Sequence, residues 1–419
     1  MNDNLFKVFS LILLAAAIAL SPSFSFGSLP DGKAIEIRAE DILIMILGLI
    51  WIADFLISGR REIKKPPLLL PVLAWLGIGF ASVLTNWILG KLKFERGFFY
   101  FLKEIEFFVL YFYVFYEIKN ISSAKLIISS WFFLAALNVG YVVYYLLIGA
   151  PLRKYGEYGI GAICEWGVFP SGCFFLLFFI FLYNIFLYYF FNLNISKFKK
   201  LCLGFLSISP VVGAFSSGSK TIFLAVIFSF VLTAMLFFRK RNKLFKKVLA
   251  TALSLFLMII FLLLVMARVP VVNERVVKVS SPSGFISDVK RDRINFIKKN
   301  FKEIMNKKSF LLPVLGFGIG YVGEAHNQYL RNFIETGIIG SVIFLILIFV
   351  VIKTTWQAYL KNEDNLSIGL SAGFLTATLA MLFCSLATEP FIVVKPSEVY
   401  WFFGGITMAV LSLNKKAGY

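Results

Sequence analysis

Histidine, cysteine and acidic side chains are scarce in this chain of 419 residues, which has one histidine, four cysteines and 23 acidic residues. The cysteines show no CxxC spacing, so the sequence indicates neither a zinc site nor a disulfide scaffold. All lie in or beside apolar segments, where buried free thiols are expected: Cys164, Cys173, Cys202 and Cys384. Polar sequence is also too sparse to cover soluble domains, because 59% of the residues are hydrophobic. These shortages favour a chain whose solvent is the lipid bilayer.

The formal net charge of +19 raises the question of a nucleic-acid partner. A nucleic-acid-binding protein gathers its basic residues in one patch. Here they lie mostly in short loops between apolar runs, so membrane topology explains the charge and no nucleic acid is expected as a partner.

Apolar runs recur along the whole chain, each of the length needed to cross about 30 Å of hydrocarbon as a helix. Short alternating segments typical of strands are absent, which predicts an all-α polytopic fold. We expect about twelve transmembrane helices, near residues 5–25, 41–58, 67–86, 98–117, 125–147, 169–191, 199–216, 221–238, 248–267, 337–354, 367–387 and 399–413.

Lysine and arginine in alternate loops predict the orientation in the membrane. The basic loops at 59–65, 194–200, 239–247 and 415–416 fall on one side if twelve segments alternate. That side is expected to be cytoplasmic, with both termini there. The first segment ends at 21–23 in the manner of a signal peptide, but its apolar run is long for one and favours a helix.

One long loop, 268–336, falls on the outer side and divides the chain into three parts. Helices 1–9 occupy 1–267, the loop domain occupies 268–336 and helices 10–12 occupy 337–419. Apolar residues at helical spacing among charges predict an amphipathic loop helix over about 287–308.

The only histidine, His326, lies in this outer loop between two glycine-rich strings, 316–320 and 335–340. Histidine alone has an ordinary pKa that lets it take and return a proton near neutrality. The GFGIG string at 316–320 lacks the context of a nucleotide-binding loop and is interpreted as a turn that constrains the histidine segment.

Cationic residues on the same side are candidates for binding an anion. Lys220 begins a membrane helix, where free backbone N–H groups favour negative charge, although a lysine that reaches to the interface is an equal alternative. Arg291 and Arg293 lie on the predicted loop helix, and Arg331 follows His326 by five residues. For Arg291, a solvated helix face is the stronger alternative.

Acidic residues at the last outer turn are candidates for orienting an imidazole. Glu389 ends an otherwise uncharged helix and is favoured over Glu398, which has the position of an ordinary helix-start acid. Glu104 and Glu106 lie inside a membrane segment and are expected to pair with Lys103 or to face the bundle interior.

The run from Arg293 to Gly340 resembles the signature region of the O-antigen ligase and O-antigen polymerase superfamily. That signature has an arginine in a loop helix, a GxGxG-like turn, HNxYL and ExGxxG, and here the last three read GFGIG at 316–320, HNQYL at 326–330 and ETGIIG at 335–340. The family's Ser-Arg pair at the start of a mid-chain helix is replaced by Ser219-Lys220, which is a departure.

The resemblance implies a GT-C-like, metal-independent glycosyltransferase without cofactors, which uses an undecaprenyl-diphosphate-linked glycan as donor. It would be a multi-pass protein of the cell inner membrane, with its active site on the periplasmic side. His326 would act as base and Glu389 as its partner. The diphosphate would be held by Lys220, Arg293 and Arg291. Three residues of the motif would support the site: Asn327, Tyr329 and Arg331.

Two enzymes and one carrier remain open at this point. An O-antigen ligase, favoured because the late outer loop carries the histidine, transfers the glycan to a lipid A-core oligosaccharide. A polymerase transfers it to another lipid-linked repeat. A transporter or flippase for lipid-linked sugars would predict intramembrane charges and paired broken helices in two similar halves. Here the polar candidates cluster on one face, and the asymmetry of the chain with its late loop favours an enzyme.

Overall fold

The computed structural model describes residues 3–21, 23–28, 34–57, 66–147, 168–217, 219–240, 311–323 and 325–418. Its elements in chain order are α1 Asp3–Leu20, β1 Ser23–Ser28, β2 Ala34–Arg38, α2 Ala39–Ile57, α3 Leu69–Ile88, α4 Phe94–Glu117, α5 Ile121–Leu147, α6 Val168–Tyr188, η2 Phe190–Asn192, α7 Lys197–Ile208, α8 Pro210–Ser216, α9 Lys220–Lys240, α14 Leu311–Leu315, α15 Gln328–Lys361, α16 Asn365–Ser385 and α17 Val394–Gly418. The predicted segment 248–267, the predicted loop helix over 287–308, Arg291 and Arg293 lie outside the described residues.

Every predicted membrane segment in the described part of the chain is mostly helical. Seven stretches there are long and apolar enough to cross a membrane: Leu69–Ile88, Ile121–Tyr144, Phe169–Asn192, Lys197–Ser216, Lys220–Lys240, Gln328–Lys361 and Asn365–Ser385. The expectation of a predominantly helical, multi-pass membrane protein is therefore confirmed.

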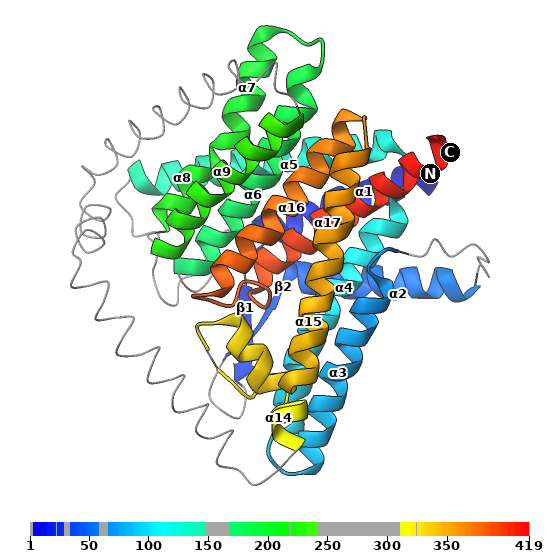
Figure 1. Ribbon diagram of the computed structural model, residues 1–419, viewed down its shortest axis with the longest axis vertical. Coiled ribbons are helices and arrows are strands. Elements are labelled where there is room, and N and C mark those ends of the chain that lie inside the picture. Colours follow the sequence, from blue (N-terminus) through cyan, green and yellow to red (C-terminus); the bar gives the residue numbers. More distant parts are fainter. Residues whose placement is uncertain are drawn as a thin grey trace.

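The core of the bundle is built around α6 and α16, whose side chains are buried on almost every side. Figure 1 shows α16 lying between α6 and α15. Helices that are apolar all round belong in such a place. Phe181 of α6 stacks on Phe403 of α17 with ring centroids 4.2 Å apart. Gly369 lets the two central helices approach, because a Cβ there would lie 3.3 Å from the carbonyl oxygen of Asn184.

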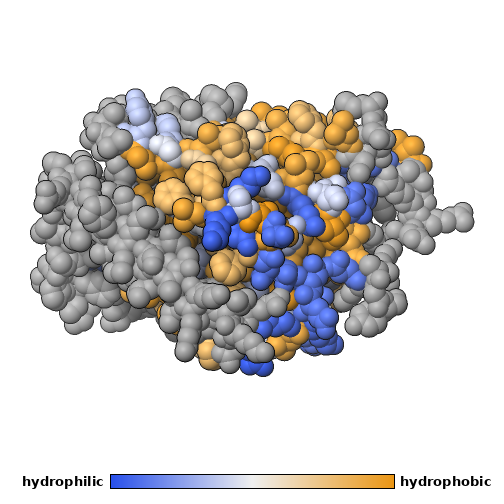
Figure 2. Space-filling view, turned by 90° about the horizontal axis from the view of Figure 1, so that it is seen from above, coloured by the Kyte–Doolittle hydropathy of each residue, from blue (hydrophilic) through white to orange (hydrophobic). Residues whose placement is uncertain are grey.

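The outer faces of several helices carry large apolar side chains that nothing in the described chain covers. Leu70 and Leu73 of α3, together with Leu345 and Phe349 of α15, are all more than half exposed. Such side chains are stable against lipid tails. Figure 2 looks at the end of the bundle where α7 lies in Figure 1, and it shows a hydrophilic patch bordered by apolar surface.

The region between the first two helices corrects two predictions. The first helix ends at Leu20 instead of residue 25, since Pro22 follows in the sequence and the residue before a proline disfavours helix. Strands were expected to be absent, but β1 and β2 pair antiparallel, with Phe24 opposite Ile37. The segments SFSFGS and AIEIR alternate in polarity, as strands do. Each is much shorter than the apolar runs from which the helices are predicted, so neither is predicted as a strand.

Two other helices differ from their predicted course. The segment 199–216 is two helices, because Pro210 begins α8 one residue after Ser209, the C-cap of α7. The predicted helix start at 337 is instead a kink inside α15, which begins nine residues earlier at Gln328. The loop domain predicted over 268–336 therefore ends in helix.

Candidate functional site

The candidate site is built on the first turns of α15. Asn327 caps this helix, because its Oδ1 accepts the backbone N–H of Leu330 at 2.9 Å. Gly337 then breaks the helical course with φ 65° and ψ −165°. The predicted HNQYL motif thus spans the cap, so that His326 and Asn327 precede the helix and the remaining three residues open it.

The glycine string before the histidine is a turn, as predicted, and it interlocks with the kink. Gly316, Gly318 and Gly320 all have positive φ, which favours glycine. The N–H of Phe317 donates to the carbonyl of Ile334 at 2.8 Å, and the N–H of Gly318 donates to that of Glu335 at 2.9 Å.

Helix α3 secures this turn from the other side. Ser82 Oγ lies 2.6 Å from the carbonyl oxygen of Leu315 and 2.7 Å from that of Glu335. Asn86 Nδ2 donates to the carbonyl of Gly316 at 2.9 Å. Both polar side chains are buried, so they satisfy backbone groups that water does not reach.

Replacing Gly337 by alanine is expected to destabilise the protein by at least about 1–3 kcal/mol. The residue has φ 65°, and a Cβ would come within 2.3 Å of the carbonyl oxygen of Val314. Gly140→Ala is the matched control, because its Cβ would meet nothing within 4 Å. Unfolding midpoints in detergent measure the effect, and equal midpoints for the two variants would contradict the interlock.

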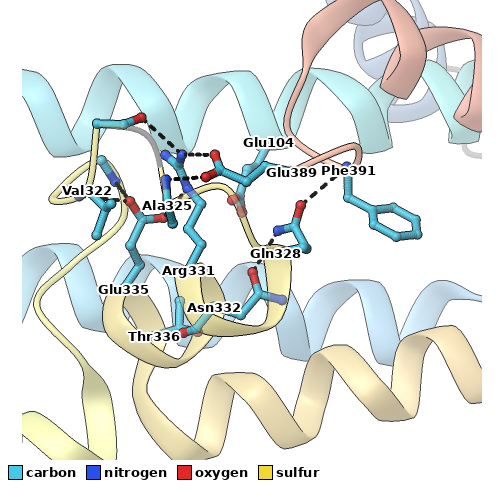
Figure 3. A network of polar contacts seen from close by, with 12 residues as sticks. Glu104, Val322, Ala325, Gln328, Arg331, Asn332, Glu335, Thr336, Glu389 and Phe391 are labelled. Atoms are coloured by element: carbon cyan, nitrogen blue, oxygen red, sulfur yellow. Dashed lines mark hydrogen bonds and ion pairs between the residues drawn. The ribbon is translucent and has the colours of Figure 1, made fainter. Parts of the chain in front are cut away.

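A buried arginine joins the two glycine-rich strings to the turn between α16 and α17 (Figure 3). Arg331 Nε donates to Glu335 at 3.0 Å, and its Nη1 donates to Glu389 at 2.6 Å. All three residues are buried. Charged hydrogen bonds of this length in a dry setting are among the strongest that proteins form.

The two carboxylates also hold the loop that leads to His326. The second oxygen of Glu335 accepts the N–H groups of Gly320 and Val322 at 3.0 and 3.2 Å. The second oxygen of Glu389 accepts the N–H of Ala325, the residue directly before the histidine. The ion-paired carboxylates thus fix the backbone of Gly320, Val322 and Ala325.

A third carboxylate lies near this network. Glu104 of α4 is buried and accepts Trp75 Nε1 at 3.0 Å. It is close enough to interact electrostatically with Arg331 and Glu335. The prediction that Glu104 faces the bundle interior is confirmed, and Glu106 pairs with Lys103 at 3.0 Å, also as predicted.

His326 itself is exposed and has a left-handed backbone conformation, with φ 53°. It is the only non-glycine residue of the described part with positive φ. Both neighbours are anchored, Ala325 by Glu389 and Asn327 by the bond from its Nδ2 to the carbonyl of Leu386 at 3.1 Å. A strained residue held by over-determined surroundings is typical of functional sites.

Lys220 begins α9 and is half-buried. Ser219 Oγ accepts the N–H of Ile222 at 3.4 Å in the first turn of this helix. Phe228 of α9 stacks on Phe383 near the end of α16, with centroids 5.2 Å apart. Lys240, the last residue of α9, donates to the carbonyl of Leu360 at 2.9 Å, just before α16 begins. The start of α9 with Lys220 therefore lies at the same end of the bundle as the end of α16 and the turn that holds His326.

The structure thus brings together several predicted site residues, although not in the roles expected of all of them. Tyr329 Oη donates to the carbonyl of Leu382 at 3.0 Å and so ties α15 to α16. Arg331 lies in the interior, and the recorded contacts of Glu389 are with that arginine and with the backbone before His326. Glu335 enters the sequence-based prediction only within the ETGIIG string, although its spacing of four from Arg331 is that of a helical ion pair.

An exposed imidazole on a fixed backbone can accept a proton from a hydroxyl group brought to it. The ion pairs beneath it are arranged to hold the loop. A scan against protein-family models finds no family that matches this chain, and a search of curated proteins finds no relative.

Proposed function

We propose that this protein is a metal-independent glycosyltransferase of the O-antigen ligase type, with a GT-C-like arrangement of helices. It transfers a glycan from undecaprenyl diphosphate to a hydroxyl of a lipid A-core oligosaccharide, at the periplasmic face of the inner membrane. The observation that carries the proposal is the exposed, left-handed His326 between two anchored neighbours at one end of an apolar bundle.

In this proposal the acceptor hydroxyl attacks the anomeric carbon of the donor glycan. A bond forms between the acceptor oxygen and that carbon, while the bond from the carbon to the diphosphate oxygen breaks. His326 takes the hydroxyl proton, and undecaprenyl diphosphate leaves with the electron pair. Glu389 is a positioning residue here, because it binds the N–H before His326.

Positive charge is needed where the diphosphate leaves. Lys220 supplies this charge at the start of α9. The turn after α16 lies at the same end of the bundle. Arg291 and Arg293 are assigned to the same role on the resemblance alone. Fixed cations stabilise the charge that develops on the leaving group. Lysine in place of the family's arginine keeps the charge but loses the bidentate fork.

Reconstitution of the purified chain with a lipid-linked glycan and a core acceptor tests the function. A ligase increases the mass of the acceptor by the whole glycan, without any energy source. A ladder of products on the carrier lipid would instead identify a polymerase. Movement of the donor across vesicles without a new glycosidic bond would identify a transporter and refute the proposal.

Lys220→Ala is expected to raise the donor concentration needed for half-maximal transfer by about tenfold or more, which corresponds to the loss of a charged contact of about 1.5 kcal/mol. Lys199→Ala is the matched control, since Lys199 is an exposed lysine in the first turn of another helix, α7. Initial rates against donor concentration measure both. An unchanged donor dependence in Lys220→Ala would remove this residue from the diphosphate site.

A further inference from the structure

A second buried polar cluster shares no residue with the His326 site. Glu40 and Asp41 occupy the first turn of α2, and Lys395 and Glu398 lie near the start of α17. Lys103 of α4 faces the same cluster, since it pairs with Asp41. The cluster therefore connects three elements that are far apart in the sequence.

Two of these acids are compensated by lysines. Lys395 Nζ donates to the carbonyl of Ile18 at 2.8 Å, to Ser21 Oγ at 3.2 Å and to the carboxylate of Glu40. Three acceptors match the three donors of an ammonium group. Asp41 Oδ2 lies 2.7 Å from Lys103 Nζ.

Glu398 is different, because it is 0% exposed and neither of its carboxylate oxygens has a hydrogen-bond partner among the described residues. Glu40, Asp41 and Glu106 all lie near enough to repel it electrostatically, against the attraction of Lys395. An unpaired charge in such a place costs several kcal/mol.

The charge count of the cluster points in the same direction. Four carboxylates, those of Glu40, Asp41, Glu106 and Glu398, meet the two ammonium groups of Lys103 and Lys395. Arg38 is half-buried, as Asp41, Lys103 and Glu106 also are, and attracts Glu40 and Asp41 electrostatically. Even with Arg38 counted, the four acids outnumber the three cations, so the cluster has an excess of negative charge.

The geometry of three carboxylates suits a metal ion. One oxygen each from Glu40, Asp41 and Glu398 lies within 4.8 Å of the others. Carboxylate oxygens prefer hard cations such as Ca²⁺ and Mg²⁺. Oxygens bound to one Ca²⁺ stand at most about 5 Å apart, so all three carboxylates can reach a single ion. Three protein carboxylates favour Ca²⁺ over Mg²⁺, because Mg²⁺ keeps several of its waters and is usually bound by one or two carboxylates.

We propose that Glu40, Asp41 and Glu398 bind a divalent cation, with Ca²⁺ as the best fit, and that the unpartnered Glu398 is its principal ligand. The ion neutralises the excess charge and ties the start of α2 to the start of α17. This is a structural site, separate from glycosyl transfer, and it does not depend on the proposed function.

Calcium binding to the full-length protein tests this proposal. Protein purified in detergent and stripped with a chelator is titrated with Ca²⁺ and with Mg²⁺, and both calorimetric binding and the thermal midpoint are recorded. We expect one Ca²⁺ per chain, weaker binding of Mg²⁺ and a rise of several degrees in the midpoint on adding Ca²⁺.

Glu398→Gln should weaken Ca²⁺ binding at least about tenfold, in the range seen when groups around a metal are changed. Glu363→Gln removes an exposed acid and is the matched control. Absence of Ca²⁺ binding by the wild type overturns the proposal. A folded Glu398→Gln variant that binds Ca²⁺ as tightly as the wild type overturns it as well. If that variant does not fold, the wild-type titration decides alone. Tighter binding of Mg²⁺ would overturn the choice of ion.

Discussion

The variant His326→Asn is expected to lower the rate of glycan transfer by about 10²–10⁴-fold, the usual contribution of a general base. Its unfolding midpoint should stay close to that of the wild type. Asparagine adopts left-handed backbone conformations readily and suits φ 53°. It offers no group that takes a proton near neutral pH. His326→Ala should abolish transfer as well, with expression intact.

His326→Gly separates the role of the side chain from that of the backbone. Glycine relieves the strain of a positive φ, so this variant is expected to be at least as stable as the wild type and still inactive. Product mass after reconstitution gives the activity, and thermal unfolding gives the stability. Transfer at near-normal rate in the asparagine and alanine variants would exclude His326 as the base.

The positions of the membrane helices were predictable because bilayer thickness imposes one length on every segment that crosses it. Each predicted segment in the described part of the chain contains helix, although the first was predicted to end five residues too late. The hairpin of β1 and β2 was not predicted, since its strands of six and five residues are too short to stand out against the neighbouring apolar helices.

Only those features of the site that depend on the type of a single residue could be predicted from the sequence. His326 is the only histidine, and the glycines around it indicate positive φ, which the structure shows at Gly316, Gly318, Gly320 and Gly337. Pairing across long sequence separations has no such local signal. Arg331 and Glu389 are 58 residues apart, and no sequence pattern near either residue predicts that they pair.

The surroundings of Glu398 could not be predicted from the sequence for the same reason. Glu398 has the sequence position of an ordinary helix-start acid, yet its surroundings come from α2 and α4 and leave it fully buried. Both of these elements end more than 280 residues earlier in the chain. Burial of a charge is a tertiary property, and no periodicity within α17 reveals it.

Arg331→Met is expected to lower the free energy of unfolding by about 3–5 kcal/mol, the usual cost of removing one member of a buried ion pair. The substitution leaves Glu335 and Glu389 as buried carboxylates without their cation. Nearby Glu104 adds to their repulsion. Arg331→Lys should cost less, because the charge remains while only one of the two directed contacts can form.

Chemical unfolding in detergent measures these differences, with Lys361→Met as the control for loss of an exposed cation in the same helix. That control should change stability by less than about 1 kcal/mol. The double variant Arg331→Met, Glu389→Gln should lose less than the sum of the single changes, since the second removes one stranded charge. Because the same arginine fixes the loop before His326, a folded Arg331→Lys protein should also transfer glycan more slowly. Equal stability of Arg331→Met and Lys361→Met would show that the ion pairs do not hold the loop.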